Sequence, residues 1–255
     1  VASTYIGLSA GPVLGGFMNH YLGWRSIFVL TSAVSAIVFL IALKKLPSAK
    51  VETSGQRLDI PGNILYILML TLMMFGLSAV TDLFYAKYLI IAGIALFILF
   101  VVHELKTESP IVEIRLFAQN IGYSFSNLAA LLNYGATFAL GYLLSIYLQV
   151  IKGYDSQISG LILIAQPLLQ AVLSPYCGRL SDRVSPFKLA SFGMGLCALG
   201  LFLFIFITED YPLSMIIANQ ILVGIGFAFF SSPNTNAVMS FVEKKDYSVA
   251  SSILA

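Results

Sequence analysis

The sequence has few charged residues. Lys and Arg number 14 and Asp and Glu number 12 among 255 residues, so only 10% of the chain is charged. A soluble globular domain carries about 25% charged residues, because its surface must be solvated. This deficit excludes an ordinary soluble domain. Together with a hydrophobic share of 58%, it indicates a protein that presents apolar surface to lipid.

Residues that carry chemistry are also scarce. Two cysteines, Cys177 and Cys197, are too few for a disulfide framework or a metal cluster, and they are expected to be small buried apolar residues. The two histidines, His20 and His103, lie at the ends of apolar runs, where an interfacial position is expected. A net charge of +2 gives no sign of nucleic-acid binding. We therefore expect no cofactor, no metal site and no nucleic-acid partner.

Known catalytic and nucleotide-binding patterns are missing as well. The sequence has no Gly-rich loop ending in Gly-Lys-Ser or Gly-Lys-Thr, which argues against an ATP-driven pump. It also has no cluster of His, Asp, Glu, Ser or Cys at catalytic spacing, which argues against a membrane-embedded enzyme with catalytic residues in this chain.

Eight apolar runs approach or exceed the roughly 20 residues that a helix needs to cross a bilayer. They cover residues 1–20, 26–43, 60–81, 88–102, 121–149, 156–177, 189–208 and 212–233. None of them contains Asp, Glu, Lys or Arg. The pattern predicts an all-α, polytopic membrane protein with about eight transmembrane helices.

The basic residues predict its orientation. Eleven of the 14 Lys and Arg residues fall in one alternating set of connections, and the other three fall in the opposite set. Cytoplasmic loops carry the excess of basic residues. The first set is therefore predicted to be cytoplasmic, and it comprises residues 44–59, 103–120, 178–188 and 242–248. Within it, 103–120 is read either as an amphipathic segment on the inner membrane surface or as an ordinary loop.

The first run contains the stretch GLSAGPVLGG, which is unusual for a helix. Gly7, Gly11 and Gly15 recur every four residues and so share one helix face, with Gly16 beside them. Small residues let membrane helices approach closely, and Pro12 removes a backbone donor and bends its helix. The pattern predicts either static helix packing or a bendable seam between two moving bundles.

A second pattern, GRLSDRVSPFK, begins at Gly178 at the end of the sixth run. Gly178 permits close approach of another chain segment. Asp182, followed by Arg183, is expected to cap the next helix or to pair with a neighbouring element. The alternative is a solvated loop with a weak surface ion pair.

Polar side chains inside the apolar runs form a third set of candidates. A polar group that faces lipid is costly, so these side chains are expected to face the helix bundle or a water-filled cavity. Gln166 and Gln170 lie four residues apart and share a helix face. The alternative is hydrogen bonding between helices without substrate contact. The candidate cavity-lining residues are Asn133, Tyr134, Tyr142, Gln166, Gln170 and Asn219.

These motifs resemble signatures of the major facilitator superfamily. Gly7-x-x-x-Gly11-Pro12-x-x-Gly15-Gly16 resembles motif C, the antiporter signature on the fifth helix of its drug exporters, and the following GWRSIF resembles the opening of the sixth. The GRLSDR stretch resembles the C-terminal copy of motif A, but its VSPFK tail departs from the usual basic run. The two runs before the second half resemble the extra helices of the fourteen-helix drug:H+ antiporter branch.

The resemblance implies a domain organisation. The chain is expected to be an internal fragment that corresponds to helices five to twelve of fourteen. Residues 1–43 would end the N-terminal six-helix bundle, 44–59 would be a cytoplasmic linker, and 60–102 would be the two extra helices. Residues 103–120 would form a cytoplasmic connection, and 121–255 would begin the C-terminal bundle.

The resemblance also implies a function. It implies a monomeric plasma-membrane transporter that exports drugs or other amphiphilic molecules in exchange for protons by alternating access. Motif C would then be a packing or hinge element, and Gly178, Asp182 and Arg183 a cytoplasmic gate. No Asp or Glu lies mid-span, so the coupling acid is expected in helices outside the fragment. The alternative is a transporter of the same superfamily for a siderophore, sugar or amino acid.

Overall fold

The computed structural model describes residues 2–45, 59–81, 83–107, 110–242 and 247–254. Within these ranges the chain is helical, without strands. Most of the linker predicted over 44–59 and part of the connection predicted over 242–248 lie outside the described residues.

The helices follow the predicted apolar runs closely. They are α1 (Ala2–Leu22), α2 (Arg25–Lys45), α3 (Ile60–Ser78), α4 (Ala86–Glu104), α5 (Ile114–Gln119), α6 (Ile121–Ile146), η1 (Tyr147–Ile151), α7 (Ser156–Leu163), α8 (Ala165–Ser181), α9 (Pro186–Leu203), η2 (Phe204–Phe206), α10 (Leu213–Ser240) and α11 (Tyr247–Leu254). Among the described residues, 7 helical segments are long and apolar enough to cross a membrane. The first predicted span, α1, has 21 residues but is not one of them, because its Gly, Ser and Pro residues lower its hydropathy.

The structure corrects several boundaries. The run predicted to be short, 88–102, becomes a helix of 19 residues, because the helix begins at Ala86 and continues through His103 to Glu104. The connection 103–120 is therefore shorter, and it contains the six-residue helix α5. The predicted span 156–177 is divided into α7 and α8 at Ile164, just before Gln166 and Pro167. The last turns of the span 121–149 form the π-helical η1.

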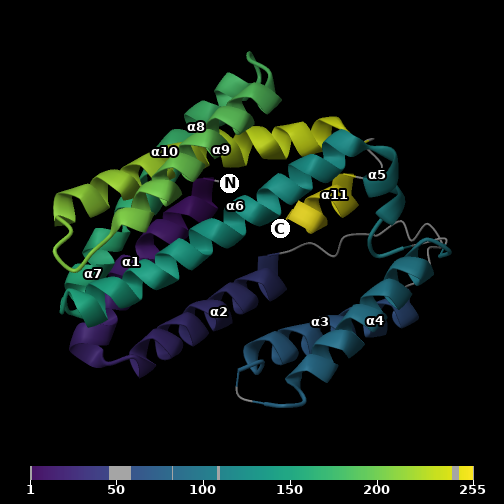
Figure 1. The fold of residues 1–255 in the computed structure, drawn as a ribbon, viewed down its shortest axis with the longest axis horizontal. Helices are drawn as coiled ribbons and strands as arrows, with labels where there is room; N and C mark the ends of the chain where they lie inside the picture. Colours follow the sequence, from purple (N-terminus) through teal and green to yellow (C-terminus); the bar gives the residue numbers. More distant parts are fainter. Residues whose placement is uncertain (1, 46–58, 82, 108–109, 243–246, 255) are drawn as a thin grey trace. The chain divides into compact units, whose positions relative to one another are not determined.

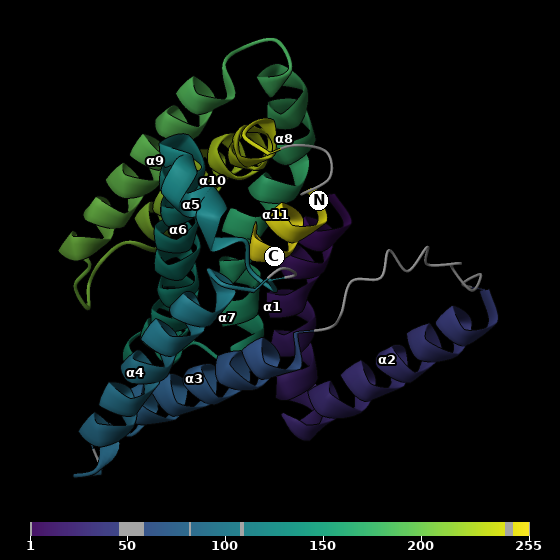
Figure 2. The same cartoon turned by 90° about the vertical axis from the view of Figure 1, so that its right-hand side faces the viewer.

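The first compact unit of the chain, unit 1, comprises Val1–Ser48 and Ser126–Ser240. Within it α10 packs along both α8 and α9, and α1 packs along α7 and α8 (Figures 1 and 2). Fourteen residues of α10 are buried, whereas none in α2 is. Gly193 of α9 lies directly against the α10 backbone, where a Cβ would be 2.5 Å from the carbonyl oxygen of Gly226. Small residues thus set the helix separation.

A glycine also makes the turn between α1 and α2. Gly23 has a φ of +78°, a left-handed conformation that side chains with a Cβ rarely adopt. Ser26 Oγ donates a 2.7 Å hydrogen bond to the carbonyl oxygen of Gly23 and so fixes the start of α2. The GWRS sequence therefore encodes a tight helix-to-helix corner.

The second compact unit, unit 2, comprises Ala49–Phe125 and Phe241–Ala255. Its main feature is the helix pair α3–α4, whose members lie side by side in both ribbon views (Figures 1 and 2). Gly76 packs against Ile90, and Gly93 packs against Met73. Because a short connection joins the two helices, the N-terminus of α3 and the C-terminus of α4 lie at the same end of the pair.

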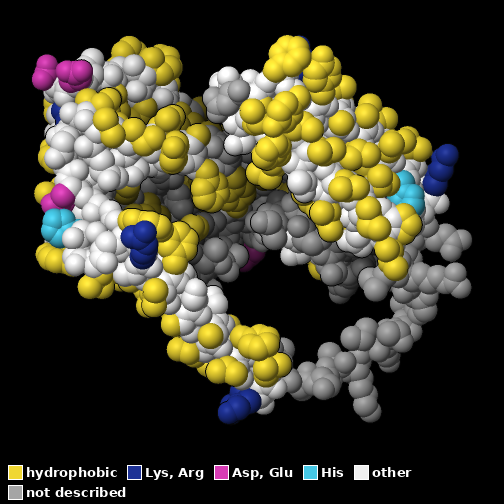
Figure 3. Space-filling view, turned by 90° about the horizontal axis from the view of Figure 1, so that it is seen from below, with side chains coloured by type: hydrophobic (Ala, Val, Ile, Leu, Met, Phe, Trp, Pro, Cys, Tyr) yellow, Lys and Arg dark blue, Asp and Glu magenta, His cyan; other side chains and the backbone are white. Residues whose placement is uncertain are grey.

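The described surface is largely apolar. On the face drawn in Figure 3, hydrophobic side chains are spread over all the described parts, and charged side chains are sparse. Exposed large hydrophobic residues occur on almost every long helix. Such a surface is stable in lipid and not in water, so it fits the spans predicted from composition.

Candidate functional site: a polar cavity within apolar helices

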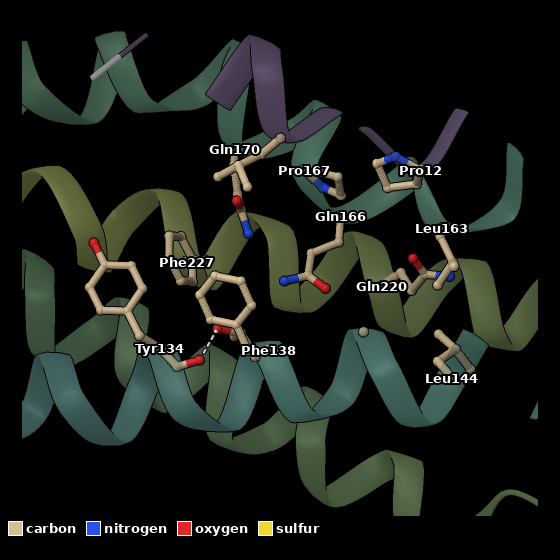
Figure 4. Close-up of a pocket in the computed structure, with 13 residues that line it drawn as sticks. Pro12, Tyr134, Phe138, Leu144, Leu163, Gln166, Pro167, Gln170, Gln220 and Phe227 are labelled. Atoms are coloured by element: carbon tan, nitrogen blue, oxygen red, sulfur yellow. Dashed lines mark hydrogen bonds between the residues drawn. The ribbon is translucent and has the colours of Figure 1, made fainter. Parts of the chain in front are cut away.

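Unit 1 contains a cavity of about 230 Å³ bounded by α1, α6, α7, α8 and α10. Figure 4 shows Gln166 and Gln170 extending from α8, with Tyr134 and Phe138 of α6 lying across from them and Phe227 on α10. Its lining residues are Leu8, Pro12, Tyr134, Thr137, Phe138, Gly141, Leu144, Leu163, Gln166, Pro167, Gln170, Gln220 and Phe227.

The chemistry of the cavity is apolar with a few neutral polar groups. Its lining contains three glutamine amides, one phenol and one threonine hydroxyl, and no Asp, Glu, Lys, Arg or His. Aromatic rings supply flat apolar area, and amides offer both donors and acceptors. The arrangement is typical of small-molecule sites, in which a few convergent polar groups interrupt an apolar lining.

Gln220 is the most buried of the three glutamines. Gln220 is 1% exposed, and its Nε2 makes no hydrogen bond to any described residue. A buried amide donor without a partner costs about 1–3 kcal/mol. A ligand or water in the cavity that accepts a hydrogen bond from Nε2 would remove this cost.

Tyr134 is held in place from two sides. Its hydroxyl lies 3.1 Å from Ser231 Oγ, and its ring packs edge-on against Phe227 with ring centroids 5.2 Å apart. Both partners belong to α10. The Tyr134 ring is therefore a fixed wall of the cavity.

Three of the six residues predicted to line a cavity do so: Tyr134, Gln166 and Gln170. The structure places the other three elsewhere. Asn133 is buried, and its Nδ2 lies 3.9 Å from the sulfur of Met194 on α9. Tyr142 is 69% exposed, and Asn219 is buried outside the lining.

The candidate residues chosen from the sequence did not include the two α10 residues that line the cavity, Gln220 and Phe227. Gln220 is adjacent to Asn219, and both are polar residues in an apolar run, so polarity alone does not separate them. The available signal was helical spacing: Gln220 lies seven residues before Phe227, two turns along the same face. Phe138 of α6 carries no polar signal at all.

The helix α1 closes one side of the cavity by backbone contact with α7. A Cβ at Gly16 would collide with the carbonyl oxygen of Ser156, and a Cβ at Gly160 would collide with that of Pro12. Ser156 Oγ also donates a 3.2 Å hydrogen bond to the carbonyl oxygen of Gly16. The close approach predicted for the glycine-rich stretch therefore occurs, and Gly16 makes it.

The other three glycines of that stretch have a different environment. A Cβ at Gly7, Gly11 or Gly15 would meet no described atom within 4 Å. The smooth face predicted from their spacing is therefore present, but no described element of this chain fills it.

The structure agrees with the close approach expected at Gly178 but not with the helix cap expected at Asp182. A Cβ at Gly178 would lie 2.9 Å from Ser232 Oγ, so this glycine does permit close approach of α10. Asp182, by contrast, is the C-terminal cap residue of α8, and Ser185 occupies the N-cap position of α9. The expectation that Asp182 caps the following helix is wrong, because the chain needs three further residues to turn.

The ion pair expected for Asp182 is also absent from the described residues, where both Asp182 and Arg183 are exposed. The junction of α8 and α10 is held instead by neutral groups. Asn236 Nδ2 donates a 2.5 Å hydrogen bond to Ser181 Oγ, which in turn donates to the carbonyl oxygen of Gly178. A second cavity of about 350 Å³ adjoins this junction, and Asp182 lines it.

Unit 2 holds a polar cluster that sequence analysis did not predict. His103, expected to be an interfacial residue, lies in the last turn of α4, and its Nε2 lies 2.9 Å from Asp59 Oδ1. Glu104, beside it, is 2% exposed. The order of these residues in the sequence could have indicated the cluster. Asp59 directly precedes one span, and His103 and Glu104 end the next one. Consecutive spans are antiparallel, so these residues meet at one end.

Comparison with known proteins then identifies the family. A family model described as Major Facilitator Superfamily matches residues 126–255, just over half of the chain. The chain belongs to the major facilitator superfamily. The resemblance given by the glycine-rich and GRLSDR motifs is thereby confirmed.

The chain resembles proteins whose names give different functions. It is 26% identical over 250 residues to the riboflavin transporter RibZ of Clostridioides difficile, covering 98% of this chain and 54% of RibZ. It is 25% identical over 257 residues to the multidrug resistance protein Stp of Mycobacterium tuberculosis, covering 98% of this chain and 47% of Stp. It is 27% identical over 264 residues to the cephamycin export protein CmcT of Amycolatopsis lactamdurans, covering 99% of this chain and 54% of CmcT.

The chain therefore spans about half the length of the curated relatives it matches. Superfamily membership and the 7 apolar helices together make it a multi-pass membrane protein.

Proposed function

We propose that the full-length protein is a secondary active transporter that exports drugs or other amphiphilic small molecules. The cavity in unit 1 carries this proposal, because it combines aromatic walls with a few neutral polar groups. Such a lining binds molecules with a large apolar part and some hydrogen-bonding atoms. The name of one relative, a cephamycin export protein, supports export, and that of another, a multidrug resistance protein, supports drugs as solutes.

Alternating access is the proposed mechanism. Two helical bundles rock around a central site, so each side of the cavity must open and close in turn. The α1–α7 contact suits a seam of this kind, because Gly16 and Gly160 present backbone and no side chain there. Backbone surfaces can separate and rejoin without side-chain repacking. Motif C, with Gly7, Gly11 and Gly15 on its open face, is proposed to extend the seam to helices outside this chain.

We also propose that export is coupled to proton entry. Moving a proton needs a titratable group within the membrane, and no described helix carries Asp or Glu in its central turns. Because the relatives are about twice as long as this chain, we place the coupling acid in the remaining part of the full-length protein. The proposed location is the plasma membrane, with the full-length protein acting as a monomer and the basic connections on the cytoplasmic side.

The motif at the end of α8 is proposed to close the cytoplasmic side. Asp182 and Arg183 are exposed, so they are free to pair with another part of the full-length protein when the gate closes. Replacing Asp182 by Asn should lower transport without reducing insertion, whereas Asp210→Asn, an exposed acid in the opposite connection, should have no effect. Equal transport by both variants would remove this role.

A second candidate function is transport of another solute. The alternatives considered from sequence are a siderophore, a sugar or an amino acid, and RibZ adds a neutral aromatic solute. The three glutamine amides favour such a solute over an organic cation, because the described lining contains no carboxylate to balance a positive charge.

The deciding experiment uses vesicles that contain the full-length protein. Efflux of a fluorescent organic cation and of riboflavin is measured with and without a pH gradient. Proton-coupled drug export predicts gradient-dependent movement of the cation. Movement of riboflavin alone would favour the second candidate, and no movement of either would contradict both.

Two glutamine variants connect that activity to the cavity. Gln170 is 4% exposed and lines the cavity, whereas Gln149 is exposed at the end of the α6 segment. Gln170→Leu removes a hydrogen-bonding amide and should lower efflux about tenfold. Gln149→Leu should leave it unchanged. Equal efflux by the two variants would show that this cavity is not the substrate site.

A further inference from the structure

One end of the α3–α4 pair gathers three side chains with metal-ligating atoms. They are Asp59, which precedes α3, and His103 and Glu104, which end α4. One ligand atom from each lies within 4.8 Å of the other two. The cluster belongs to unit 2 and has no part in the cavity.

Each carboxylate is fixed by a backbone hydrogen bond to one of its oxygens. The amide of Gly62 donates a 2.9 Å bond to Asp59 Oδ1, which caps α3. The amide of Val112 donates a 2.8 Å bond to Glu104 Oε2. The second oxygen of Glu104, Oε1, has no hydrogen-bond partner among the described residues, and that of Asp59 lies 3.0 Å from His103 Nε2. Backbone partners of this kind orient ligands around metal ions and stiffen the site.

Glu104 Oε1 is the observation that points to a ligand. Glu104 is 2% exposed, and Oε1 is buried without a hydrogen-bond partner among the described residues. It faces the Asp59 carboxylate across Gly62, where a Cβ would lie 2.7 Å from Oε1 and would collide with Asp59 Oδ2. Gly62 therefore leaves the space in which the two carboxylates converge.

The cluster brings two carboxyl groups and one imidazole together at a single point. Buried carboxylates are stabilised by pairing or by coordinating a metal ion. A divalent cation would balance the charges of both carboxylates and would also occupy the unsatisfied oxygen of Glu104.

The third group, His103, is the most exposed of the three and opens the cluster to solvent. Its side chain is 31% exposed, whereas that of Asp59 is 4% exposed. Its Nε2 points at the carboxylate, 2.9 Å from Asp59 Oδ1 and 3.0 Å from Oδ2. Thr107 Oγ1 lies 3.3 Å from the same nitrogen. An ion can therefore reach the cluster past the imidazole.

We propose that Asp59, His103 and Glu104 bind one divalent transition-metal ion of the Zn²⁺ type. The site would use one oxygen from each carboxylate and Nε2 of the imidazole, with water as the fourth ligand. Two protein ligands of a tetrahedral zinc ion lie roughly 3.4 Å apart, so the observed spacing needs only a small adjustment. The imidazole favours Zn²⁺ over Mg²⁺ and Ca²⁺, which prefer oxygen ligands.

Binding would join three segments at one point: the start of α3, the end of α4 and, through Glu104 and Val112, the approach to α5. This site differs from the expectation of no metal drawn from composition. It does not rest on the proposed transport function, because none of its ligands lines the cavity.

The test measures metal bound to the purified full-length protein without a polyhistidine tag. Bound Zn²⁺ is determined by elemental analysis after equilibration and desalting, and Co²⁺ serves as an optical probe. The wild-type protein should hold one equivalent more than Glu104→Gln or His103→Gln. Removing either ligand should weaken Zn²⁺ binding by at least about 100-fold. Mg²⁺ should not compete.

The matched control is His20→Gln. His20 Nδ1 also lies near a carboxylate, 3.7 Å from Asp155 Oδ2, but no third ligand lies beside the pair among the described residues. This variant should retain the bound metal. Each variant is checked for monodispersity in detergent, so that loss of metal is distinguished from loss of fold.

A fourth variant keeps the proposal falsifiable if the others are unstable. His103→Cys replaces the imidazole by a thiolate ligand and should retain the ion, with a new sulfur-to-cobalt absorption band. The proposal is overturned if wild-type protein holds no more Zn²⁺ than Glu104→Gln. It is also overturned if His103→Cys binds Co²⁺ without that band. In either case the two carboxyl groups share a proton and hold no metal.

Discussion

The cavity in unit 1 is bounded by neutral amides and aromatic rings, whereas the cluster in unit 2 combines two carboxylates with an imidazole. Most of the cavity residues lie inside long apolar segments, and the cluster residues lie at helix ends. A charge at the centre of a bilayer is costly, while a charge at the interface retains contact with water. Position along the apolar segment thus separates the two kinds of polar group.

The two regions also differ in how their helices are joined. In unit 1, α1 meets α7 through the backbone at Gly16 and Gly160. In unit 2, hydrogen bonds to Asp59 and Glu104 tie the ends of α3 and α4 to their surroundings. A larger side chain at a backbone contact pushes the two helices apart. Loss of a side chain from a polar cluster instead leaves a buried group without its hydrogen-bond partner. Opposite kinds of mutation should therefore damage the two regions.

The largest expected effect comes from placing a charge in the cavity. Gln220→Glu should lower transport of neutral and cationic solutes by at least about 100-fold, because a buried unpaired carboxylate costs several kcal/mol. The same change at Gln149, which is exposed, should have little effect. Initial efflux rates from vesicles measure both. Full activity of Gln220→Glu would show that the cavity is hydrated enough to accept charge.

The next largest effect is expected at the α1–α7 contact. Gly16→Leu should destabilise the protein by about 1–3 kcal/mol and abolish transport, because its side chain would displace the Ser156 backbone. Gly15→Leu, whose Cβ meets no described atom within 4 Å, should keep this contact intact. Thermal unfolding in detergent distinguishes them. Equal unfolding temperatures would mean that the contact contributes no stability.

Removing a partner from the cluster should have a similar or smaller effect on stability. Glu104→Ala leaves the amide of Val112 without its acceptor and should cost about 1–3 kcal/mol. Glu113→Ala is the control, because this carboxylate makes no capping hydrogen bond. The apparent unfolding temperature is measured after chelator treatment, so that bound metal does not contribute. Transport at low temperature should be nearly unchanged, which would separate the cluster from the cavity.

The smallest effect is expected at Tyr134. Tyr134→Phe removes the hydroxyl contact with Ser231 and keeps the ring contact with Phe227, at a cost of about 0.5–1.5 kcal/mol. The KM for solutes that accept hydrogen bonds should rise a few-fold, and that for purely apolar solutes should not change. A uniform change for all solutes would indicate a general loosening of the wall.

Prediction from sequence succeeded where one physical rule acted alone. Each predicted span is helical in the structure, because lipid exposure and backbone hydrogen bonding leave an apolar run few alternatives. Boundaries were less certain: α4 continues to Glu104, because the end of the run at Val102 does not itself stop a helix. The break between α7 and α8 had no separate signal beyond Pro167.

The sites were only partly predictable, because several rules compete there. Four-residue spacing placed Gly7, Gly11 and Gly15 on one face, but the direction from which α7 approaches selected Gly16. Polarity selected Asn219 and Gln220 equally, and the rotation of α10 turned only Gln220 toward the cavity. Rotation about a helix axis depends on all neighbouring helices, so no local pattern specifies it.

The sequence by itself determined the membrane environment, the helical class and the family signature, because these follow from composition and from short motifs. Tertiary structure alone decided which polar atoms converge. Asp59 and His103 are separated by 44 positions in the chain, yet 2.9 Å separates their side-chain atoms. Antiparallel packing of α3 and α4 brings them together, and the desolvation of Glu104 between them turns three unremarkable end residues into a candidate metal site.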